Sequence, residues 1–156
     1  MNFIFFSVHF PDFNKEFSFH LHQFGVNVLG IGDTGYHTLD DRLKSSLTEY
    51  YRVSNLEDYD EVLRAVGYFT HKYGKIDRFE SLNEHWLELE AMIRTDFNIT
   101  GVKADFVKDI KQKSRMKHFF SKSGVKTIPY LDKINRMKAR KFVESHGYPI
   151  IVKPDK

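Results

Sequence analysis

Two lysines placed 40 residues apart are the residues of this chain best suited to chemistry. Lys113 opens the run Lys113-Ser-Arg-Met-Lys117, and Lys153 closes the apolar run Gly147-Tyr-Pro-Ile-Ile-Val152. That apolar run predicts a buried strand, so the ammonium of Lys153 must emerge at its end, where Pro154 stops further sheet pairing. A charged donor at the end of a rigid strand is suited to bind a phosphate as a point charge.

The surroundings of Lys113 depend on where its helix begins. If a basic helix runs unbroken from Ala104, then Phe106, Ile110 and Lys113 share one face, and the lysine extends its ammonium to the edge of an apolar stripe. If the helix begins near Lys113, the ammonium lies beside a free helix end. The sequence leaves both arrangements open.

Size and composition predict a folded chain with its own core. The chain has 156 residues, of which 41% are hydrophobic and 15% aromatic, values typical of packed rather than disordered proteins. It has no cysteine, which excludes disulfides and thiolate catalysis. The opening residues 1–6 lack a basic region and predict a first strand rather than a signal peptide. No apolar stretch approaches the roughly 20 residues needed to cross a bilayer, and we expect a cytoplasmic protein.

Charge is distributed unevenly along the chain. Residues 103–141 contain 13 Lys and Arg and three acidic residues, which gives +10, and the remaining residues give −7, so that the net charge is +3. A basic segment in a nearly neutral protein indicates either a solvated face or a polyanionic partner, which means nucleotide phosphates or nucleic acid.

The first hundred residues alternate between strand-like and helix-like segments. Alternation of this kind predicts an α/β fold, a Rossmann-like parallel sheet with helices on both faces. We expect strands near 3–6, 26–31, 50–53, 78–82 and 98–101, and helices near 13–24, 40–47, 55–73 and 86–93. Asp12 is placed to cap the first of these helices.

The charge shift near residue 105 predicts a boundary between residues 1–104 and 105–156. After it we expect a basic helix to Ser123, an extended piece at 125–129, and a helix at 132–146 that Asp132 caps and Gly147 ends. A strand that ends at Lys153 follows.

Several other kinds of site are excluded by their motifs. The turn after the first strand, Ser7 to Asp12, contains no glycine, so a dinucleotide fingerprint is absent and Asp33 is an isolated match for a ribose-binding acid. The chain also has no G-x-x-x-x-G-K-[ST] loop and no H-E-x-x-H. No Ser-His-Asp arrangement can be proposed from spacing alone.

Both lysine runs resemble the start of the ATP-grasp nucleotide-binding domain of enzymes such as biotin carboxylase and carbamoyl phosphate synthase. In that family a lysine opens a helix about eleven residues before a Gly-Val turn, here Gly124-Val125, and a second lysine ends the strand after Gly-Tyr-Pro. Residues 78–84 and 97–101 are similar to segments of the domain that precedes it. The resemblance implies a pre-ATP-grasp Rossmann-like domain at 1–104 and the beginning of an ATP-grasp domain at 105–156. It departs from the family at Lys126, where a proline is usual, and at the Pro11 turn.

By this resemblance, Lys113 and Lys153 would bind ATP phosphates, and magnesium ligands would follow Lys156. The complete enzyme would join a small-molecule carboxylate to an amine, a thiol or a related nucleophile through an acylphosphate. The first domain would supply one wall of the acceptor-substrate cleft, with Ser7, His9, Asp33 and Glu84 as wall residues. We expect the chain alone to be inactive and to bind nucleotide weakly.

Two alternatives from other classes remain. One is a non-catalytic remnant of a ligase. The other is a nucleic-acid or partner-binding module that uses residues 103–141. We expect Phe119 and Phe120 in the core, which disfavours a nucleic-acid surface because such surfaces expose aromatic rings among their basic residues.

Overall fold

Four parallel strands form the sheet of the first part of the chain. β1 (Asn2–Phe6) lies in the middle, between β2 (Asn27–Gly32) and β4 (Arg78–Glu80), and β3 (Glu49–Arg52) pairs with β2, which gives the order β3-β2-β1-β4. Because all strands are parallel, their carboxyl ends meet at one edge. The chain first adds β2 and β3 on one side of β1 and then crosses over to add β4 on the other side. The topological switch point therefore lies between β1 and β4.

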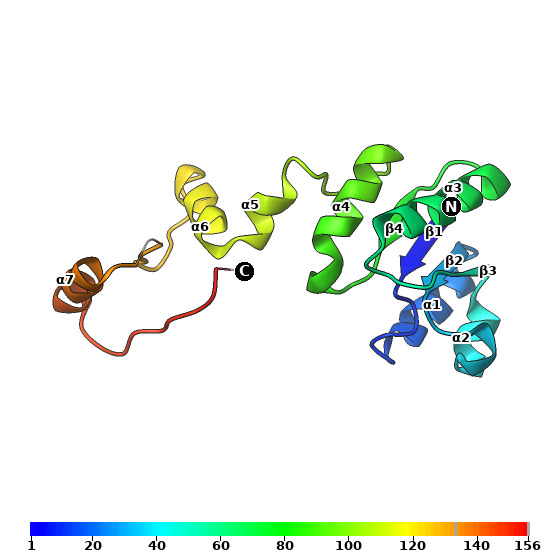
Figure 1. Ribbon diagram of the computed structural model, residues 1–156, viewed down its shortest axis with the longest axis horizontal. Helices are drawn as coiled ribbons and strands as arrows, with labels where there is room; N and C mark the ends of the chain where they lie inside the picture. The colour runs from blue at the N-terminus through cyan, green and yellow to red at the C-terminus, as the bar shows by residue number, and fades with distance from the viewer. Residues whose placement is uncertain (133, 156) are drawn as a thin grey trace. The chain divides into compact units, whose positions relative to one another are not determined.

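The computed structural model describes residues 1–132 and 134–155 and divides the chain into two compact units, unit 1 (Met1–Ala104) and unit 2 (Asp105–Lys156) (Figure 1). Unit 1 contains the sheet. The α/β class and the Rossmann-like parallel sheet that the sequence predicts are confirmed.

Helices cover both faces of the sheet in unit 1. One face packs against α1 (Asn14–Gln23) and α2 (Asp41–Ser46), which lie on the same side of the sheet in Figure 1. The other face packs against α3 (Tyr59–Tyr73) and α4 (Leu87–Asp96). Two short 3-10 helices complete the unit, η1 (Tyr36–Thr38) and η2 (Glu84–Trp86).

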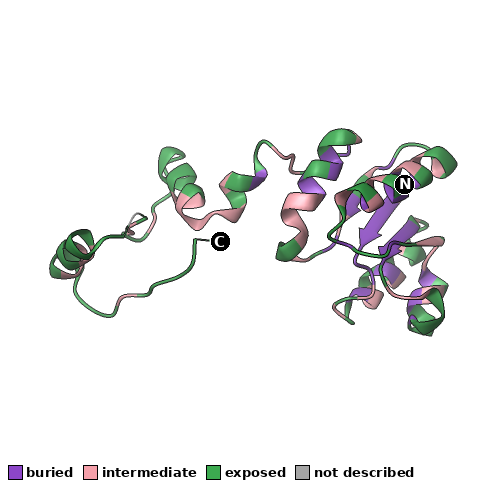
Figure 2. Ribbon diagram, viewed as in Figure 1, coloured by how far each residue is buried: buried purple, intermediate pink, exposed green. Residues whose placement is uncertain are grey.

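The side chains of β1 point alternately to the two faces of the sheet, and each face has its own hydrophobic core. Phe3 and Phe5 pack with Phe17 of α1, with ring centroids 5.8 and 5.4 Å apart, whereas Ile4 and Phe6 belong to the core beneath α3 and α4. Figure 2 shows the strands as the buried centre of unit 1. A strand buried on both faces is what the apolar run at 3–6 predicts.

Two expectations for unit 1 are wrong. Asp12 does not cap α1, since the N-cap residue is Phe13 without a side-chain bond, and the carboxylate of Asp12 pairs with Lys15 instead. No strand forms at 98–101, because Asn98 adopts a positive φ of 49° and Ile99 donates its N–H back to the carbonyl of Arg94. This segment therefore closes the end of α4 rather than extending the sheet.

The described residues of unit 2 form three helices, α5 (Val107–Lys111), α6 (Lys113–Lys122) and α7 (Arg136–His146). Gln112 is extended, with φ −84° and ψ 117°, so the basic helix breaks there and Lys113 begins α6. Asn135 caps α7 by accepting the N–H of Lys138, so the expectation that Asp132 caps this helix is wrong. Gly147 ends α7 as predicted, at φ 74°.

The strand expected before Lys153 is absent from the described residues. Residues 148–155 form no strand, and Ile151 and Val152 are 77% and 78% exposed. A strand needs a neighbour that takes up its N–H and C=O groups, and no described segment pairs with this one. Residues 149–152 therefore have a composition typical of a strand, but no described strand pairs with them.

Candidate functional site

The carboxyl edge of the sheet brings two of the expected wall residues together. His9 follows β1 and Asp33 follows β2, and the Nε2 atom of His9 lies 3.3 Å from Oδ1 of Asp33. The other ring nitrogen, Nδ1, is buried without a partner among the described atoms and lies beside Gly32. An imidazole in this setting is best arranged as the tautomer that donates from Nε2 to Asp33.

Ser7 lies at the same edge but faces inward. It is 3% exposed, it has a positive φ of 53°, and its hydroxyl donates to the carbonyl of Phe10 at 3.4 Å. A non-glycine residue in this conformation is uncommon and often lies at a functional turn. Its contribution to the edge is therefore the shape of the turn that carries His9.

A cavity of about 370 Å³ adjoins His9 between the loops that follow β1 and β2. Lys15 crosses it and pairs with Asp12 at 2.9 Å and with Asp40 at 3.4 Å. The hydrogen bond to Asp12 raises the pKa of Lys15. Burial raises the pKa of Asp40, but the N–H groups of Arg42 and Leu43 at the start of α2, together with Lys15, lower it more. The cavity thus holds two carboxylates and one shared ammonium.

The loop after β2 is held by side chains from β3. Arg52 donates from Nε to the carbonyl of Asp33 at 3.2 Å, and Tyr50 donates its hydroxyl to the carbonyl of Thr34 at 2.7 Å. Burial, with a smaller effect of the Asp33 charge, raises the pKa of Tyr50 to about 12. Sequence reasoning missed both residues, because their roles depend on the pairing of β3 with β2.

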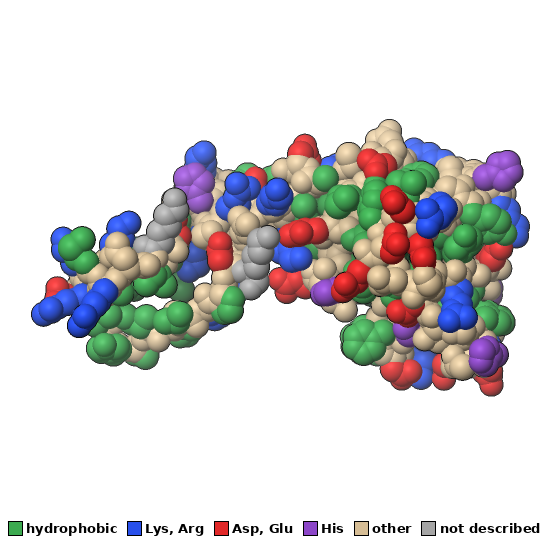
Figure 3. Space-filling view, in the orientation of Figure 1, with side chains coloured by type: hydrophobic (Ala, Val, Ile, Leu, Met, Phe, Trp, Pro, Cys, Tyr) green, Lys and Arg blue, Asp and Glu red, His purple; other side chains and the backbone are tan. Residues whose placement is uncertain are grey.

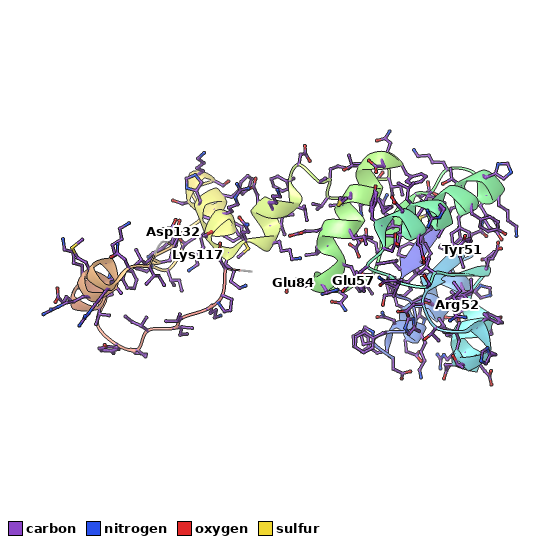
Figure 4. All side chains as sticks on the ribbon, viewed as in Figure 1. Tyr51, Arg52, Glu57, Glu84, Lys117 and Asp132 are labelled. Atoms are coloured by element: carbon purple, nitrogen blue, oxygen red, sulfur yellow. The ribbon has the colours of Figure 1, made fainter. Side chains whose placement is uncertain are left out.

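Glu84 follows β4, the strand that pairs with β1 on the side opposite to β2. It begins η2, which Asn83 caps by accepting the N–H of His85, and its own side chain is exposed. Among the described residues it forms no hydrogen bond or ion pair with Ser7, His9 or Asp33. Its neighbour His85 pairs with Glu57 at 3.4 Å, and Figure 4 labels Glu57, Glu84 and Arg52 on unit 1.

A buried ionic network fixes the end of β4. Arg94 is 3% exposed and donates from Nη2 to Glu80 at 2.5 Å and to Glu90 at 2.7 Å. The second oxygen of Glu90 accepts the N–H of Ser81 at 2.7 Å. Burial and the Glu90 charge raise the pKa of Glu80, and Arg94 opposes them. Glu90 and Arg94 are spaced i, i+4 on α4, a pattern from which the pair could have been predicted.

In unit 2, the two lysine segments lie side by side. Lys113 is the first residue of α6, and its N–H donates to the carbonyl of Asp155 at 3.1 Å. Ser114 donates its N–H and its hydroxyl to the Asp155 carboxylate at 2.8 and 2.9 Å. Asp155 is two residues beyond Lys153, and among the described residues neither lysine ammonium forms an ion pair. The chain therefore presents two cations from neighbouring backbone segments.

A second feature of unit 2 is a groove of about 530 Å³ beside α6. Its lining includes Arg115, His118 and Lys122 together with the rings of Phe119 and Tyr130. Lys117 lies over the Tyr130 ring, 4.9 Å from its centroid, and Figure 4 labels Lys117 close to the segment that carries Asp132. Lys and Arg side chains gather on the visible face of this unit in Figure 3.

The expectation that Phe119 and Phe120 are core residues is wrong. They are 45% and 39% exposed, because the described part of unit 2 supplies no second layer against which this face of α6 could pack. Phe119 meets only the edge of Phe106 among the aromatic rings described, at 5.5 Å.

The described residues hold no group of three or more His, Asp or Glu side chains that could bind a metal ion. They also contain no helix that is both long and apolar enough to span a bilayer.

Comparisons with known proteins identify the fold. An L-amino acid ligase from Bacillus licheniformis has a TM-score of 0.60 and 13% identity, over 92% of this chain and 41% of its own. The biotin carboxylase domain of the Hydrogenobacter thermophilus 2-oxoglutarate carboxylase, solved with MgADP, ADP and bicarbonate, has a TM-score of 0.62 and 18% identity, over 86% of this chain and 31% of its own. No family model matches the sequence, and no curated protein matches it.

These two solved proteins are ATP-grasp enzymes, so the resemblance drawn from the lysine runs is confirmed at the level of the fold. The chain spans about two fifths of the ligase and about a third of the carboxylase domain.

Proposed function

We propose that this chain is the front part of an ATP-dependent ligase that joins a small-molecule carboxylate to an amine or a thiol through an acylphosphate. The observation that carries the proposal is the return of the Lys153 segment to the start of α6, where Lys113 lies. The L-amino acid ligase and the MgADP-bound carboxylase domain, whose folds are similar, support an ATP-dependent reaction.

In this proposal Lys113 and Lys153 bind the phosphates of ATP. Both ammonium groups belong to a unit that is strongly basic between residues 103 and 141, and neither is neutralised by a described carboxylate. ATP supplies the phosphoryl group that activates the carboxylate. The lysines contribute electrostatic stabilisation of that group, which is the main contribution of protein side chains in phosphoryl transfer.

Unit 1 supplies a wall of the acceptor-substrate cleft. Parallel α/β sheets bind ligands at the carboxyl ends of their strands, and this edge carries His9, Asp33 and, after β4, Glu84. The His9–Asp33 pair offers a hydrogen-bonding surface in which an imidazole lies beside a carboxylate. We propose Ser7 as the residue that shapes the turn beneath it.

Magnesium does not fit the described residues, since they form no cluster of acidic or histidine ligands. We therefore derive no step that involves the metal.

The test is chemical labelling with an acyl-phosphate derivative of ATP. A lysine beside the bound phosphates takes the acyl group on its amine, and ATP leaves. We expect Lys113 and Lys153 to be acylated and to be protected by excess ATP, with Lys122 and Lys141 as unprotected controls in the same unit. Equal labelling of all four lysines, unaffected by ATP, would refute the proposal. Because we expect weak binding by this chain, a sub-micromolar constant in a calorimetric titration with Mg-ATP would contradict that expectation.

A second function has one observation in its favour, the exposure of Phe119 in the groove of unit 2, whose lining includes Arg115 and Lys122 besides two acidic residues. Exposed aromatic rings beside Lys and Arg bind single-stranded nucleic acid by stacking and by phosphate contacts. Affinity for an oligonucleotide that falls steeply with salt, together with loss of binding in Phe119→Ala, would favour this function over the ligase.

A further inference from the structure

The first turn of α6 is capped from a distant part of the chain. Gln112, which precedes the helix, makes no side-chain bond to it. Three donors converge instead on Asp155: the N–H of Lys113 on its carbonyl, and the N–H and hydroxyl of Ser114 on its carboxylate, at 3.1, 2.8 and 2.9 Å. The first N–H groups of a helix lack partners within it, so Asp155 acts as a cap supplied from 41 residues away.

The described residues of unit 2 form almost no apolar core between these segments. Among its described residues only Val107 is buried. The hydrogen bonds described between residues 148–155 and the helices of this unit are those of Asp155. Because the described residues of unit 2 bury only Val107, we expect the relative position of α6 and the Lys153 segment to depend strongly on the bonds of Asp155.

The same bonds fix the backbone segments from which the side chains of Lys113 and Lys153 extend. Lys113 directly precedes Ser114, and Lys153 lies two residues before Asp155. Fixing both backbone segments lowers the entropy lost when two flexible lysines converge on one polyanion. The carboxylate acts on main-chain and hydroxyl donors, and a negative charge is favourable at a helix N-terminus.

We propose that Asp155, through Ser114, is a positioning residue that holds Lys113 and Lys153 at one nucleotide-phosphate site. This inference rests on the proposed function, because it specifies how the two lysines of that site are kept together. Asp155 contacts no phosphate in this arrangement. It acts through the backbone on which the lysines are mounted.

The connection itself is tested without nucleotide. Amide hydrogen exchange at Ser114 in the full chain reports its bond to Asp155. We expect Asp155→Ala to accelerate this exchange by about tenfold, as the loss of a charge-assisted hydrogen bond implies. Asp155→Asn keeps an oxygen for the Ser114 N–H and an amide group for its hydroxyl. In this variant the Ser114 amide should therefore exchange at close to the wild-type rate. Exchange that is unchanged in Asp155→Ala overturns the proposal.

The positioning role is tested by acylation with the same ATP derivative. We expect Asp155→Ala to lower ATP-protected labelling of Lys113 and Lys153 together by about tenfold, with Lys122 unchanged. Ser114→Ala should lower it by a smaller factor, and Ser114→Thr, which keeps the hydroxyl, should restore it. The matched control is Ser145→Ala, which removes a hydroxyl bonded within α7 and should label as wild type.

The outcomes separate the two proposals. If the wild-type chain labels Lys113 and Lys153 and Asp155→Ala labels them equally well, the positioning role is overturned and the nucleotide site stands. If the wild-type chain shows no ATP-protected labelling, the nucleotide site fails and the positioning role fails with it. Recovery in Asp155→Asn separates hydrogen bonding from charge, because a purely electrostatic role would be lost in that variant as well.

Discussion

Replacing Arg94 by methionine is expected to destabilise unit 1 by about 3–5 kcal/mol, because it leaves the buried carboxylate of Glu90 without its counter-ion. The guanidinium serves four acceptors: Glu80 and Glu90 at 2.5 and 2.7 Å, and the carbonyls of Phe79 and Val102 at 2.9 and 3.4 Å. Methionine fills much of the volume and replaces none of these bonds. Against a typical domain stability of about 5–15 kcal/mol, such a loss is large.

Urea unfolding followed by tryptophan fluorescence measures this loss. Trp86 is the single tryptophan of the chain, and it packs edge-on against Phe6 at 5.0 Å, so its emission reports unit 1. The matched control is Arg42→Met, since Arg42 pairs with Glu16 at 2.7 Å but both side chains are nearly half exposed. An exposed pair of this kind contributes about 0–1 kcal/mol.

The pH dependence of the free energy of unfolding tests whether the loss comes from carboxylates that no longer have a counter-ion. In the wild type, burial and the charge of Glu90 raise the pKa of Glu80, while Arg94 opposes them. Without Arg94 the folded-state pKa of Glu80 rises further above its unfolded value. The penalty is then complete above the folded pKa and shrinks as the pH falls toward the unfolded pKa. Arg94→Met should therefore approach the wild type on going from neutral to mildly acidic pH, and Glu90→Gln added to Arg94→Met should recover part of the stability. A loss no larger than that of Arg42→Met, or one independent of pH and of Glu90→Gln, would refute the reasoning.

Two further predictions use the same unfolding assay. Burial raises the pKa of Glu49, but hydrogen bonds from Lys72 and from two tyrosine hydroxyls lower it more. Glu49 therefore stabilises the fold at pH values above its unfolded pKa. This contribution is lost as the pH falls through its folded pKa. Glu49→Gln should cost about 1 kcal/mol at neutral pH and flatten the acid limb of the stability curve, and an unchanged acid limb would contradict this. Gly32→Ala should cost about 1–3 kcal/mol, because its Cβ would lie 2.5 Å from the Tyr50 hydroxyl and 2.9 Å from Nδ1 of His9. Gly67→Ala, whose Cβ meets no atom within 4 Å inside α3, should instead stabilise by about 0.5–1 kcal/mol; equal effects of the two glycine substitutions would contradict the steric argument.

The sheet could be predicted from the sequence because its signals are local. The apolar run at 3–6 and the alternation of segments after it reflect burial on two faces, and each strand lies within two residues of its predicted position. The segment at 98–101 failed because its apolar Ile99 packs into the core from a turn rather than from a strand. Hydrophobicity reports burial in both cases and does not report which backbone conformation achieves it.

The candidate site was only partly predictable. The types and spacing of Lys113 and Lys153 indicated a pair, and the structure brings their backbone segments together, while their role as phosphate ligands stays a prediction. Asp155 carried no sequence signal, because a cap that acts across 41 residues leaves no local pattern. The place of Glu84 after β4, on the side of β1 opposite to the strand that precedes Asp33, likewise depends on strand order, which periodicity does not contain.

The near absence of buried side chains in the described part of unit 2 has a calorimetric consequence. The heat-capacity change of unfolding grows with the apolar area that becomes hydrated, and from Asp105 onward only Val107 is buried among the described residues. A scanning calorimeter should therefore record a single endotherm whose size matches the residues of unit 1 rather than the whole chain. Any melting temperature assigned to this protein is a property of the sheet and its helices, and nucleotide added to the lysine-bearing unit would shift its midpoint little even when it binds.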